Sequence, residues 1–449
     1  MRLPGGKQRR PAHLYQELCR QLLGRVPSRS VSTAYFKAFS LSFLFMSILD
    51  SLSSAEEWEK FLGYKKEKRQ LSKKEEAQLE SFIAEERYLP ICAGFDFGYP
   101  EKKEITKLGS SKKRVVYSYG EDETWVLKFL AYLLYRYDGC LSDSCYSFRR
   151  NRTAKTAFDR ILAVRDLGSM YSLKLDIHDY FNSIDTGQLI KTLEEIITDD
   201  EPLLSLLKDL LLLDRCIWQG EVIEEKRGAM AGVPLASFFA NVYLKDLDLL
   251  FEERGVPYFR YSDDMIIFSE TKEELGESFS LIEDFLREKG LTLNMSKYRM
   301  AGPGEAWDFL GFCYRNGQID LADATVKKMM GKIRRKAGKL YRRRKEKGVS
   351  FEKAARSMIN SFDHKFYDLT GTNDFTWTRF YFPVITTAEG LKKIDRYMVQ
   401  YLRYLYSGRH YKGNYRVSYE DLKKLGYTPL AAEYYNWKRE NRELDELNR

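Results

Sequence analysis

Two adjacent carboxylates, Asp263 and Asp264, lie inside the stretch "YFRYSDDMIIF" at residues 258–268. Aromatic and β-branched residues flank the pair, and burial of a carboxylate is strongly unfavourable unless a cation compensates its charge. The stretch is therefore restricted to a tight hairpin that carries both acids at or beside its turn, with a cation nearby. Asp199 and Asp200 in "ITDDEPLL" are also adjacent, but they separate two helical stretches, so we expect a solvated linker or helix cap there.

The elements around this hairpin predict a split βαβ arrangement. "YSLKLDI" alternates in polarity and predicts a half-buried strand that ends near Asp176. A largely apolar helix is expected from Pro234 onward, and a second helix, opened by a T-x-x-E capping box, is expected between Thr271 and Gly290. "LTLNMSK" at 291–297 is predicted to be the last strand. Strand, helix, hairpin, helix and strand in this order are typical of a ferredoxin-like domain.

This order brings three carboxylates together. The first strand and the hairpin are neighbours in such a sheet, so Asp176 can approach Asp263 and Asp264. The site contains oxygen ligands without nearby Cys or His, which favours Mg²⁺ or Mn²⁺ over zinc. Two such ions about 3.5–4 Å apart can hold the attacking and leaving oxygens of a phosphoryl transfer. The residues alone therefore predict metal-dependent phosphoryl transfer.

The net charge of +9 is concentrated in one segment. Residues 326–348 hold twelve basic residues and one acidic residue, a local charge of +11, so the rest of the chain sums to −2. Apolar residues recur at helical spacing within this segment and predict a docked helix with a cationic side: Val326, Met330, Ile333, Ala337, Leu340 and Tyr341. A salt-laced surface helix would need interspersed acids. A polyanion, in particular nucleic acid, is the expected partner.

Composition excludes several other classes of protein. With 449 residues and 44% hydrophobic content, the chain can bury sizeable cores in two to four units. The best membrane candidate, "AFSLSFLFMSIL" at 38–49, is too short to cross a bilayer, so we expect a buried helix, no membrane contact and a cytoplasmic location. Six scattered cysteines without a C-x-x-C pair indicate neither a zinc module nor a disulfide framework.

Six segments together resemble the reverse transcriptases of the bacterial lineage that includes group II intron, retron, diversity-generating and defence-associated enzymes. The resemblance covers roughly residues 86–420 and is strongest to the stand-alone, defence-associated enzymes of the unknown groups. Each segment alone is a weak pattern, whereas six in the correct order are specific. The six are "CYSFRRNRTAKTAF", "LKLDIHDYFNSID", "GAMAGVPLASFFANVYLKDLD", "RYSDDMIIF", "LTLNMSKYRM" and "WDFLGF".

The resemblance implies an α+β right-hand polymerase with fingers, a ferredoxin-like palm and a helical thumb. A further hairpin is predicted at Asn316 and Gly317, between two short strands. The expected regions are a helical N-terminal extension at 1–85, fingers at 86–170, a palm at 171–318 with a fingers insertion at about 187–228, and a basic helical thumb and C-terminal region at 319–449.

The resemblance also assigns roles to individual residues. Asp176, Asp263 and Asp264 match the catalytic triad that holds two Mg²⁺ ions, with Mn²⁺ as the alternative, and the carbonyl of Ile177 is an extra ligand. Phe181 matches the aromatic gate beneath the incoming sugar, which implies deoxynucleotide substrates. From its spacing alone, Phe181 would be a core aromatic residue.

Other residues match nucleotide-binding positions of the family. Lys113, Arg114 and Arg149 are expected to hold the triphosphate, although isolated basic residues are as often surface charges. The backbone amide of Asp179 is expected nearby, and Lys297 matches the lysine that protonates the leaving pyrophosphate.

Template and primer contacts are expected at a glycine and along the basic segment. Gly232 matches the glycine that lets the backbone approach the template or primer. The family's usual Q-G-x-x-x-S-P is here "AGVPLAS", which leaves template contacts and priming open. The basic residues expected to contact template and primer are Lys332, Arg334, Arg335, Arg342 and Arg343.

The function implied is RNA-directed DNA synthesis from dNTPs on an RNA template, with DNA as product. Because no Cys-rich nuclease or RNase H-like acid set is seen, we expect a stand-alone enzyme that acts in antiviral defence with a dedicated non-coding RNA. A homo-oligomer or an accessory protein stays open. The alternatives are an RNA-binding maturase or scaffold with a vestigial site, a mobile-element or diversity-generating reverse transcriptase, and an RNA polymerase, against which Phe181 argues.

Overall fold

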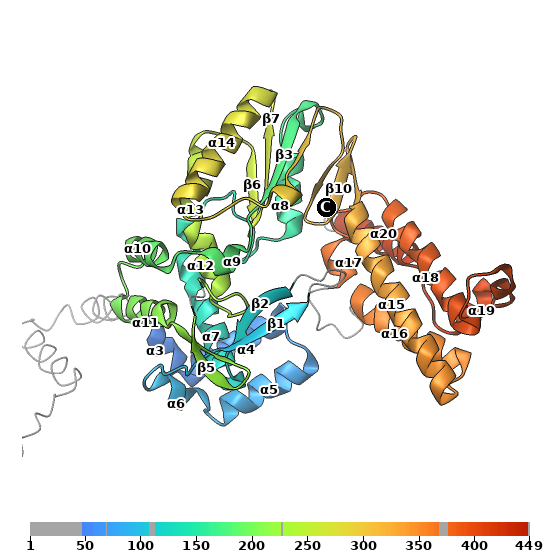
Figure 1. Cartoon of the computed structure of the whole chain (residues 1–449), viewed down its shortest axis with the longest axis horizontal. Coiled ribbons are helices and arrows are strands. Elements are labelled where there is room, and N and C mark those ends of the chain that lie inside the picture. The colour runs from blue at the N-terminus through green and yellow to red at the C-terminus, as the bar shows by residue number, and fades with distance from the viewer. Residues whose placement is uncertain (1–46, 69, 107–112, 226–227, 368–375, 448–449) are drawn as a thin grey trace, which may run out of the picture.

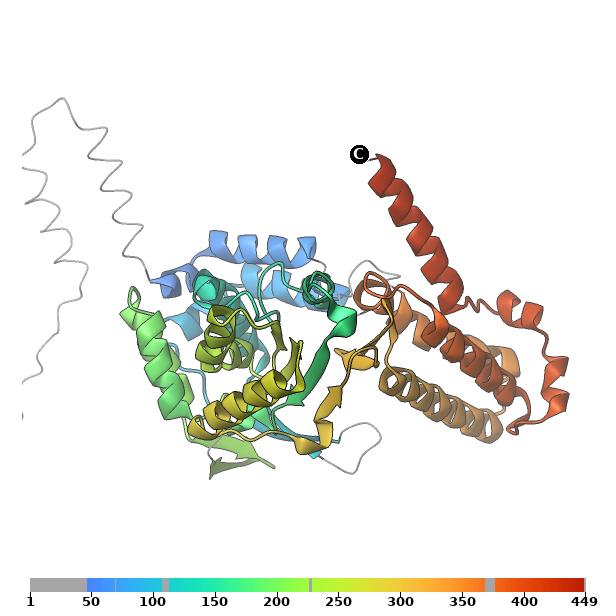
Figure 2. The same ribbon diagram turned by 90° about the horizontal axis from the view of Figure 1, so that it is seen from above.

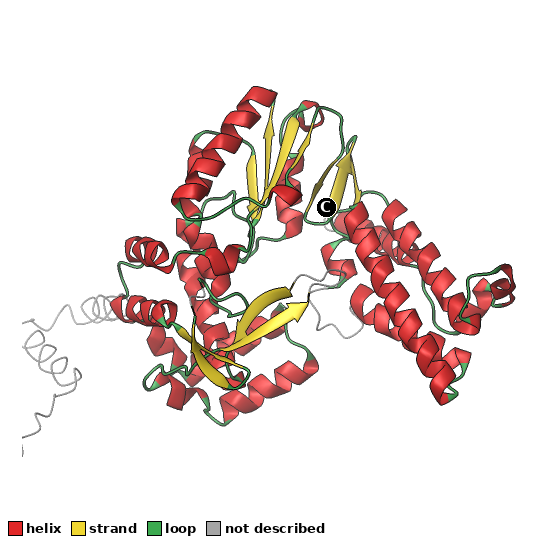
Figure 3. Ribbon diagram, in the orientation of Figure 1, coloured by secondary structure: helices red, strands yellow, loops and turns green. Residues whose placement is uncertain are grey.

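The computed structural model describes residues 47–68, 70–106, 113–225, 228–367 and 376–447. Helices surround three separate sheets within these residues (Figure 3). We name the β6-β7-β3-β8 sheet the palm sheet, the β2-β1-β4-β5 sheet the fingers sheet, and the β11-β10-β9 sheet the small sheet. The helices α15 to α20 are named the thumb helices.

The palm sheet is antiparallel and carries helices on both faces (Figure 1). Helix α14 packs against β3 and β7, and α13 packs against β6. The elements of this part are β3 (Tyr171–Asp176), α9 (Tyr180–Ser183), α10 (Thr186–Ile196), α11 (Glu201–Leu212), α12 (Ala236–Tyr243), α13 (Lys245–Glu253), β6 (Tyr258–Tyr261), β7 (Asp264–Ser269), α14 (Lys272–Glu288), the 3-10 turn η3 (Met295–Lys297) and β8 (Arg299–Ala301).

Strand β7 separates two hydrophobic cores. Met265 and Ile267 face the core shared with the fingers, whereas Ile266 and Phe268 face the core shared with the thumb helices. All four side chains are fully buried. Because side chains alternate along a strand, a strand buried on both faces is a continuous apolar run, as "MIIF" is here. Charge is therefore confined to the first residue of β7.

The N-terminal helices share a core with the fingers. Trp58 is fully buried, and its ring contacts those of Phe61, Phe82, Tyr88 and Phe129. Strands β4 and β5 follow β3 in the chain, yet β4 pairs in parallel with β1. The elements are α3 (Ile48–Leu52), α4 (Ala55–Glu67), α5 (Lys73–Ala84), α6 (Tyr88–Cys92), β1 (Glu101–Thr106), β2 (Lys113–Ser118), α7 (Glu121–Leu133), the 3-10 helix η1 (Leu134–Cys140), α8 (Ala154–Leu162), the turn η2 (Leu167–Ser169), β4 (Arg215–Trp218) and β5 (Glu221–Glu224).

The thumb helices lie beyond the small sheet, at one side of the molecule (Figures 1 and 2). Helix α15 packs along α18 and α16, and the last helix, α20, projects away from the rest in Figure 2. The elements are β9 (Trp307–Phe309), β10 (Phe312–Arg315), β11 (Gln318–Leu321), α15 (Asp323–Lys347), α16 (Phe351–Phe366), α17 (Trp377–Phe380), α18 (Glu389–Ser407), η4 (Lys412–Arg416), α19 (Tyr419–Lys424) and α20 (Leu430–Leu447).

Asp320 on β11 fastens the thumb helices to the small sheet. Its carboxylate accepts hydrogen bonds from the backbone amides of Glu389 (2.9 Å) and Gly390 (3.0 Å). The residue at the α18 N-cap provides no side-chain cap, so Asp320 satisfies these amides from another element. Gly390 is required here, because a Cβ atom would lie 2.7 Å from the Asp320 carboxylate.

Two expected elements differ in the structure. The helix expected from Pro234 is two helices, α12 beginning at Ala236 and α13 beginning at Lys245, with Leu244 between them. The strand predicted at 291–297 makes one isolated bridge through Leu293 and then a 3-10 turn, and the regular strand is β8 instead. The polar side chains of this segment are turned toward β3, which breaks the strand alternation.

The expectation that Asp199 and Asp200 are solvated is wrong for Asp200. This residue does cap α11, as its side chain accepts from the amide of Leu203, but it is only 3% exposed. Its carboxylate also accepts from the Ser47 hydroxyl and the Ile48 amide, both at 2.7 Å. The start of α3, 152 residues away in the chain, therefore covers it.

Other expectations are confirmed. Asn316 (φ 49°) and Gly317 (φ 77°) form the tight turn between β10 and β11. The basic segment is helical in α15, whose buried stripe includes Ile333 and Ala337. Thr271 caps α14 by accepting from the Glu274 amide, and the Glu274 carboxylate accepts a hydrogen bond from the Ser269 hydroxyl. The expected buried helix at 38–49 lies almost entirely outside the described residues.

Asp363 in the last turn of α16 makes stability depend on pH. Burial raises the pKa of this carboxyl from 3.8 to about 6. The folded chain therefore holds the proton more tightly than the unfolded chain, and the free energy of unfolding falls as pH rises from about 4 to about 6. We expect Asp363→Asn to stabilise the protein by about 1 kcal/mol at pH 7.5, a value discounted for partial exposure, and by less at pH 5.

Thermal unfolding of both proteins at the two pH values measures this effect. Asp96→Asn, at an exposed aspartate, is the matched control and should change stability equally little at both. A gain for Asp363→Asn that is the same at both pH values would contradict the prediction.

Candidate active site

The palm sheet brings the three predicted carboxylates to one end. Asp176 at the end of β3 pairs in register with Asp264 at the start of β7, and Asp263 precedes it in the hairpin turn. The amide of Ile177 donates to the carbonyl of Asp263 at 3.2 Å, which ties the two segments together just beyond the ladder. The structure thus confirms that these acids are neighbours.

Burial makes this cluster electrostatically unfavourable. Asp176 is 2% exposed, and Asp263 and Asp264 are half-buried. Burial raises the pKa of Asp263, and the nearby Asp176 carboxylate raises it further. Burial also raises the pKa of Asp264, with Lys174 opposing the effect. Three negatively charged groups are therefore concentrated at this end of the sheet.

Two lysines and an asparagine face the acids. The Lys297 ammonium forms an ion pair with Asp176 Oδ2, and Asn294 Nδ2 donates to Asp176 Oδ1 at 2.9 Å. Burial lowers the pKa of Lys297, but the hydrogen bond that its ammonium donates to Asp176 outweighs this effect and raises the pKa above its ordinary value. Lys174 Nζ lies 3.8 Å from Asp264 Oδ1. Lys297 was predicted at this site, whereas Lys174 and Asn294 were not.

The hairpin turn is held in an unfavourable backbone conformation. Ser262 has a φ of 61°, in the left-handed region that side chains other than glycine rarely adopt. Its amide donates to the Ser147 hydroxyl at 2.9 Å, and its carbonyl accepts from Arg260 at 3.2 Å. Bonds from two sides therefore fix the turn that carries Asp263.

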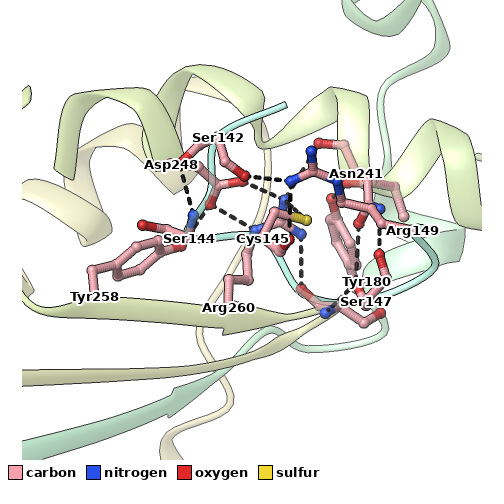
Figure 4. A network of polar contacts seen from close by, with 12 residues as sticks. Ser142, Ser144, Cys145, Ser147, Arg149, Tyr180, Asn241, Asp248, Tyr258 and Arg260 are labelled. Atoms are coloured by element: carbon pink, nitrogen blue, oxygen red, sulfur yellow. Dashed lines mark hydrogen bonds and ion pairs between the residues drawn. The ribbon is translucent and has the colours of Figure 1, made fainter. Parts of the chain in front are cut away.

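Arg260 lies at the centre of a buried network behind this turn (Figure 4). Arg260 and Asp248 of α13 form an ion pair in which both side chains are fully buried. The Tyr258 hydroxyl donates to the same carboxylate at 3.0 Å. Burial opposes the charge of Arg260, but Asp248 outweighs it and raises its pKa above the ordinary value.

The network also reaches the segment from 142 to 149. Arg260 pairs with Cys145 in an isolated parallel bridge, in which the Arg260 amide donates to the carbonyl of Ser144. Asn241 on α12 donates to the Ser147 carbonyl at 2.8 Å. One signal in the sequence could have revealed Arg260, namely a lone arginine inside an apolar strand.

The three basic residues predicted to hold a triphosphate are in different situations. Arg114 on β2 is close enough for its charge to influence Asp263. Lys113 is exposed and pairs with Glu104 at 2.5 Å. Arg149 donates to the carbonyls of Ser142 (2.6 Å) and Asp138 (2.9 Å), so its guanidinium holds its own loop. The guanidinium of Arg149 is thus engaged within its own loop, whereas the charge of Arg114 lowers the pKa of Asp263.

Phe181 lies on the short helix α9, directly after β3. Its ring is half-buried and packs at the edge of the fingers-side core, next to Tyr180. Asp179 precedes it in the left-handed conformation (φ 43°) and accepts from Asn182 Nδ2 at 3.2 Å. Gly228 is fixed by this segment, because a Cβ there would lie 2.6 Å from the Phe181 carbonyl. The sequence did not single out Gly228.

The backbone conformation and packing around residue 232 require glycine. Its φ of 104° is unfavourable for any side chain, and a Cβ would lie 2.8 Å from the Tyr117 carbonyl of β2. The Tyr117 amide also donates to the Ala231 carbonyl at 2.8 Å. The close packing of the fingers sheet thus requires glycine here, and contact with template or primer stays a prediction.

The five basic residues expected to contact template and primer share helix α15. Lys332 is half-buried, whereas Arg334, Arg335, Arg342 and Arg343 are exposed. No carboxylate of a described residue forms an ion pair with any of the five. Their positive charge is therefore available to a polyanion.

Nothing in the described part of the chain forms a complete metal-binding group of three His, Cys, Asp or Glu side chains. Lys297 and Lys174 instead lie against the acids. The three acids nevertheless suit a divalent ion, because Mg²⁺ prefers oxygen ligands. The charge of Asp176 raises the pKa of Asp263, and a bound cation would offset this repulsion. Of the helices that the structure describes, none is long and apolar enough to span a membrane.

Comparison with known proteins gives a family match to part of the chain. Residues 105–314 match the family described as "Reverse transcriptase (RNA-dependent DNA polymerase)". The retron Ec83 reverse transcriptase of Escherichia coli is 30% identical over 115 residues, which are 24% of this chain and 35% of that relative. This match spans about a third of the relative's own length.

Solved structures of telomerase are similar at a lower level. The apo enzyme from Candida Tropicalis has a TM-score of 0.43 at 13% identity, covering 74% of this chain and 60% of that chain. Telomerase from Candida albicans with the TWJ fragment of telomeric RNA has a TM-score of 0.40 at 13% identity, covering 77% and 68%.

The family match and the arrangement of the sheets define the fold class. The palm sheet has the split βαβ topology, the fingers sheet lies below it in Figure 1, and the thumb helices follow the small sheet. The fold is α+β, with the fingers, palm and thumb of a right-hand polymerase, which confirms the fold class predicted from the sequence.

The Arg260 and Asp248 pair predicts a specific double-mutant result. Arg260→Met leaves a buried, unpaired carboxylate, so we expect it to lower the free energy of unfolding by about 3–5 kcal/mol. Arg260→Met with Asp248→Leu removes both charges and should recover more than half of this loss. Denaturant unfolding measures both variants, and a single variant that loses less than about 1 kcal/mol would show that the pair is not critical.

Proposed function

We propose that the protein is an RNA-directed DNA polymerase that extends a primer with dNTPs on an RNA template. The observation that carries this proposal is the register of the palm sheet, in which Asp176 lies opposite Asp264. Asp263 is adjacent to Asp264, in the turn between β6 and β7. This arrangement lies inside residues 105–314, which match the reverse transcriptase family. Three oxygen donors at the end of a rigid sheet suit phosphoryl transfer.

Asp176, Asp263 and Asp264 are the residues that would hold divalent ions, with the Ile177 carbonyl as an added oxygen ligand. When bound, two Mg²⁺ ions polarise the phosphate and lower the pKa of the attacking hydroxyl. The apolar faces of β7 and the Arg260 network keep the carboxylates in place. Lys174 and Lys297 offset their charge in the absence of ions.

Residues around the acids would bind the incoming nucleotide. Arg114 on β2, whose charge lowers the pKa of Asp263, would contact the triphosphate together with its neighbour Lys113. Lys297, already in contact with Asp176, would donate a proton to the leaving pyrophosphate. The ring of Phe181 would occupy the space that a 2′-hydroxyl needs, with the amide of Asp179 beside the phosphates.

The basic residues of α15 would follow the backbone of the template and primer duplex. Arg334, Arg335, Arg342 and Arg343 are exposed on this helix, so binding should weaken steeply with salt. We assign the fingers to 86–170, the palm to 171–318 with the insertion at about 187–228, and the thumb and C-terminal region to 319–449. The N-terminal extension ends at about residue 85.

A role in antiviral defence, with a dedicated non-coding RNA as template, is the biological context that we propose. The similarity to the retron Ec83 reverse transcriptase of Escherichia coli supports a bacterial reverse transcriptase. The second candidate, a maturase or scaffold with a vestigial site, would tolerate loss of the acids, and all three are present. Sequencing the nucleic acid that co-purifies with the protein identifies the template.

Removal of one carboxylate should abolish synthesis. We expect Asp263→Asn to lower dNTP incorporation by roughly a thousandfold or more, because the residue acts with Asp176 and Asp264 as one unit. The assay follows labelled dNTPs on a primed RNA template with Mg²⁺. Asp96→Asn is the control and should retain activity. If Asp263→Asn synthesises DNA as fast as the parent protein, the proposed role of the acids is wrong. If the parent protein synthesises no DNA, the proposed polymerase activity is wrong.

The aromatic ring at 181 should set sugar selectivity. We expect Phe181→Val to lower the ratio of kcat/KM for dNTPs over NTPs by roughly tenfold to a hundredfold, because a smaller side chain admits the 2′-hydroxyl. Phe181→Tyr keeps the ring and should preserve the ratio. Single-nucleotide incorporation kinetics measure both substrates. Equal selectivity in Phe181→Val and the parent would mean that Phe181 is only a core residue.

A further inference from the structure

A cavity of about 480 Å³ lies at the base of the thumb helices, away from the carboxylates. It opens between the start of α15, the end of α16 and the short helix α17, beside the turn at Leu310 and Gly311 that joins β9 to β10. Its walls combine two kinds of side chain, ammonium groups and aromatic rings. Its volume lies within the range of about 300–1,000 Å³ that is typical of ligand pockets.

Three lysines line this cavity without acidic partners. They are Lys328 and Lys332 on α15 and Lys365 on α16. Among the described residues, no carboxylate lies within ion-pair distance of any of them. Burial lowers the pKa of Lys332, and the charges of Lys365 and Lys328 lower it further. Positive charge is concentrated here, which favours an anionic ligand.

Aromatic rings form the facing wall of the same cavity. Trp377, Phe380 and Tyr381 are all half-buried and line it. The Trp377 and Tyr381 rings lie 4.7 Å apart, and Phe312 stacks behind Phe380 at 5.6 Å. The three rings therefore form a packed aromatic wall along this side of the cavity.

The cavity offers little for hydrogen bonding to a base edge. Thr325 donates its hydroxyl to the Gly311 carbonyl at 2.9 Å, and the hydroxyl of Thr376 bonds that of Thr378 at 3.0 Å. The groups in the cavity that can bind a ligand are therefore mainly the aromatic rings and the lysine ammonium groups. Aromatic platforms combined with backbone-tracking cations are typical of sites that bind single-stranded nucleic acid without sequence preference.

We propose that this cavity binds one unpaired nucleotide of a nucleic-acid strand, with its base against Trp377 and its phosphates near Lys328, Lys332 and Lys365. The exposed Arg334 and Arg335, further along α15, would continue the path of the strand. The proposal rests on the proposed function only in naming that strand as part of the template and primer. Binding itself requires neither dNTPs nor a metal ion.

Equilibrium binding to full-length protein tests the proposal, with fluorescence anisotropy of labelled oligothymidylate, oligouridylate and a blunt duplex of equal length. We expect Trp377→Leu and Lys365→Gln each to weaken single-strand binding about fivefold or more, and to change duplex binding by less than about twofold. Trp218→Leu in β4 and Lys353→Gln at the start of α16 are matched controls. Lys365 is exposed, so its variant stays informative if Trp377→Leu fails to fold.

Three outcomes would overturn the proposal. Unchanged single-strand affinity in both variants would show that the cavity is not used. Equal losses for single strand and duplex would indicate a general electrostatic surface. Lost binding of free ATP or dATP, with single-strand binding intact, would indicate a free mononucleotide site. If the protein shows the expected binding but incorporates no dNTPs, the proposed polymerase activity is refuted and the proposed single-strand-binding site is supported.

Discussion

The buried ion pair between Arg260 and Asp248 is the interaction on which the site depends. Desolvation of two charges is costly, and it is offset only because the guanidinium also bonds the Ser262 carbonyl and the carboxylate also accepts from Tyr258. The pair joins α13, β6 and the hairpin turn. It therefore couples the stability of the palm core to the conformation of the residue that precedes Asp263.

The acids are tolerated because of where they lie along their strands. Each of Asp176 and Asp264 occupies the terminal position of a buried strand, so the apolar part of the strand stays in the core while the carboxylates reach the edge. Lysines 174 and 297 then offset charge without entering the core. A shift of one residue in register would move every β7 side chain to the opposite core.

The contacts that follow from the periodicity of strands and helices could be predicted from the sequence. The contacts between a side chain and backbone groups outside its own strand or helix could not. The register of Asp176 with Asp264 follows from element order and alternation. The burial of Asp200 does not, because the covering amide belongs to Ile48, 152 residues earlier. The engagement of Arg149 is equally hidden, since its acceptors are carbonyls, which no side-chain pattern displays.

The bonds that Asp320 makes to the start of α18 have a mechanical consequence. Because Thr386 also accepts from the Ile319 amide at 2.8 Å, the connection into α18 is clamped to β11 along its length. The small sheet and the start of α18 are therefore joined by several hydrogen bonds, so a displacement of α18 would be transmitted to β11. Any rotation of the thumb carries the turn at Gly311 with it.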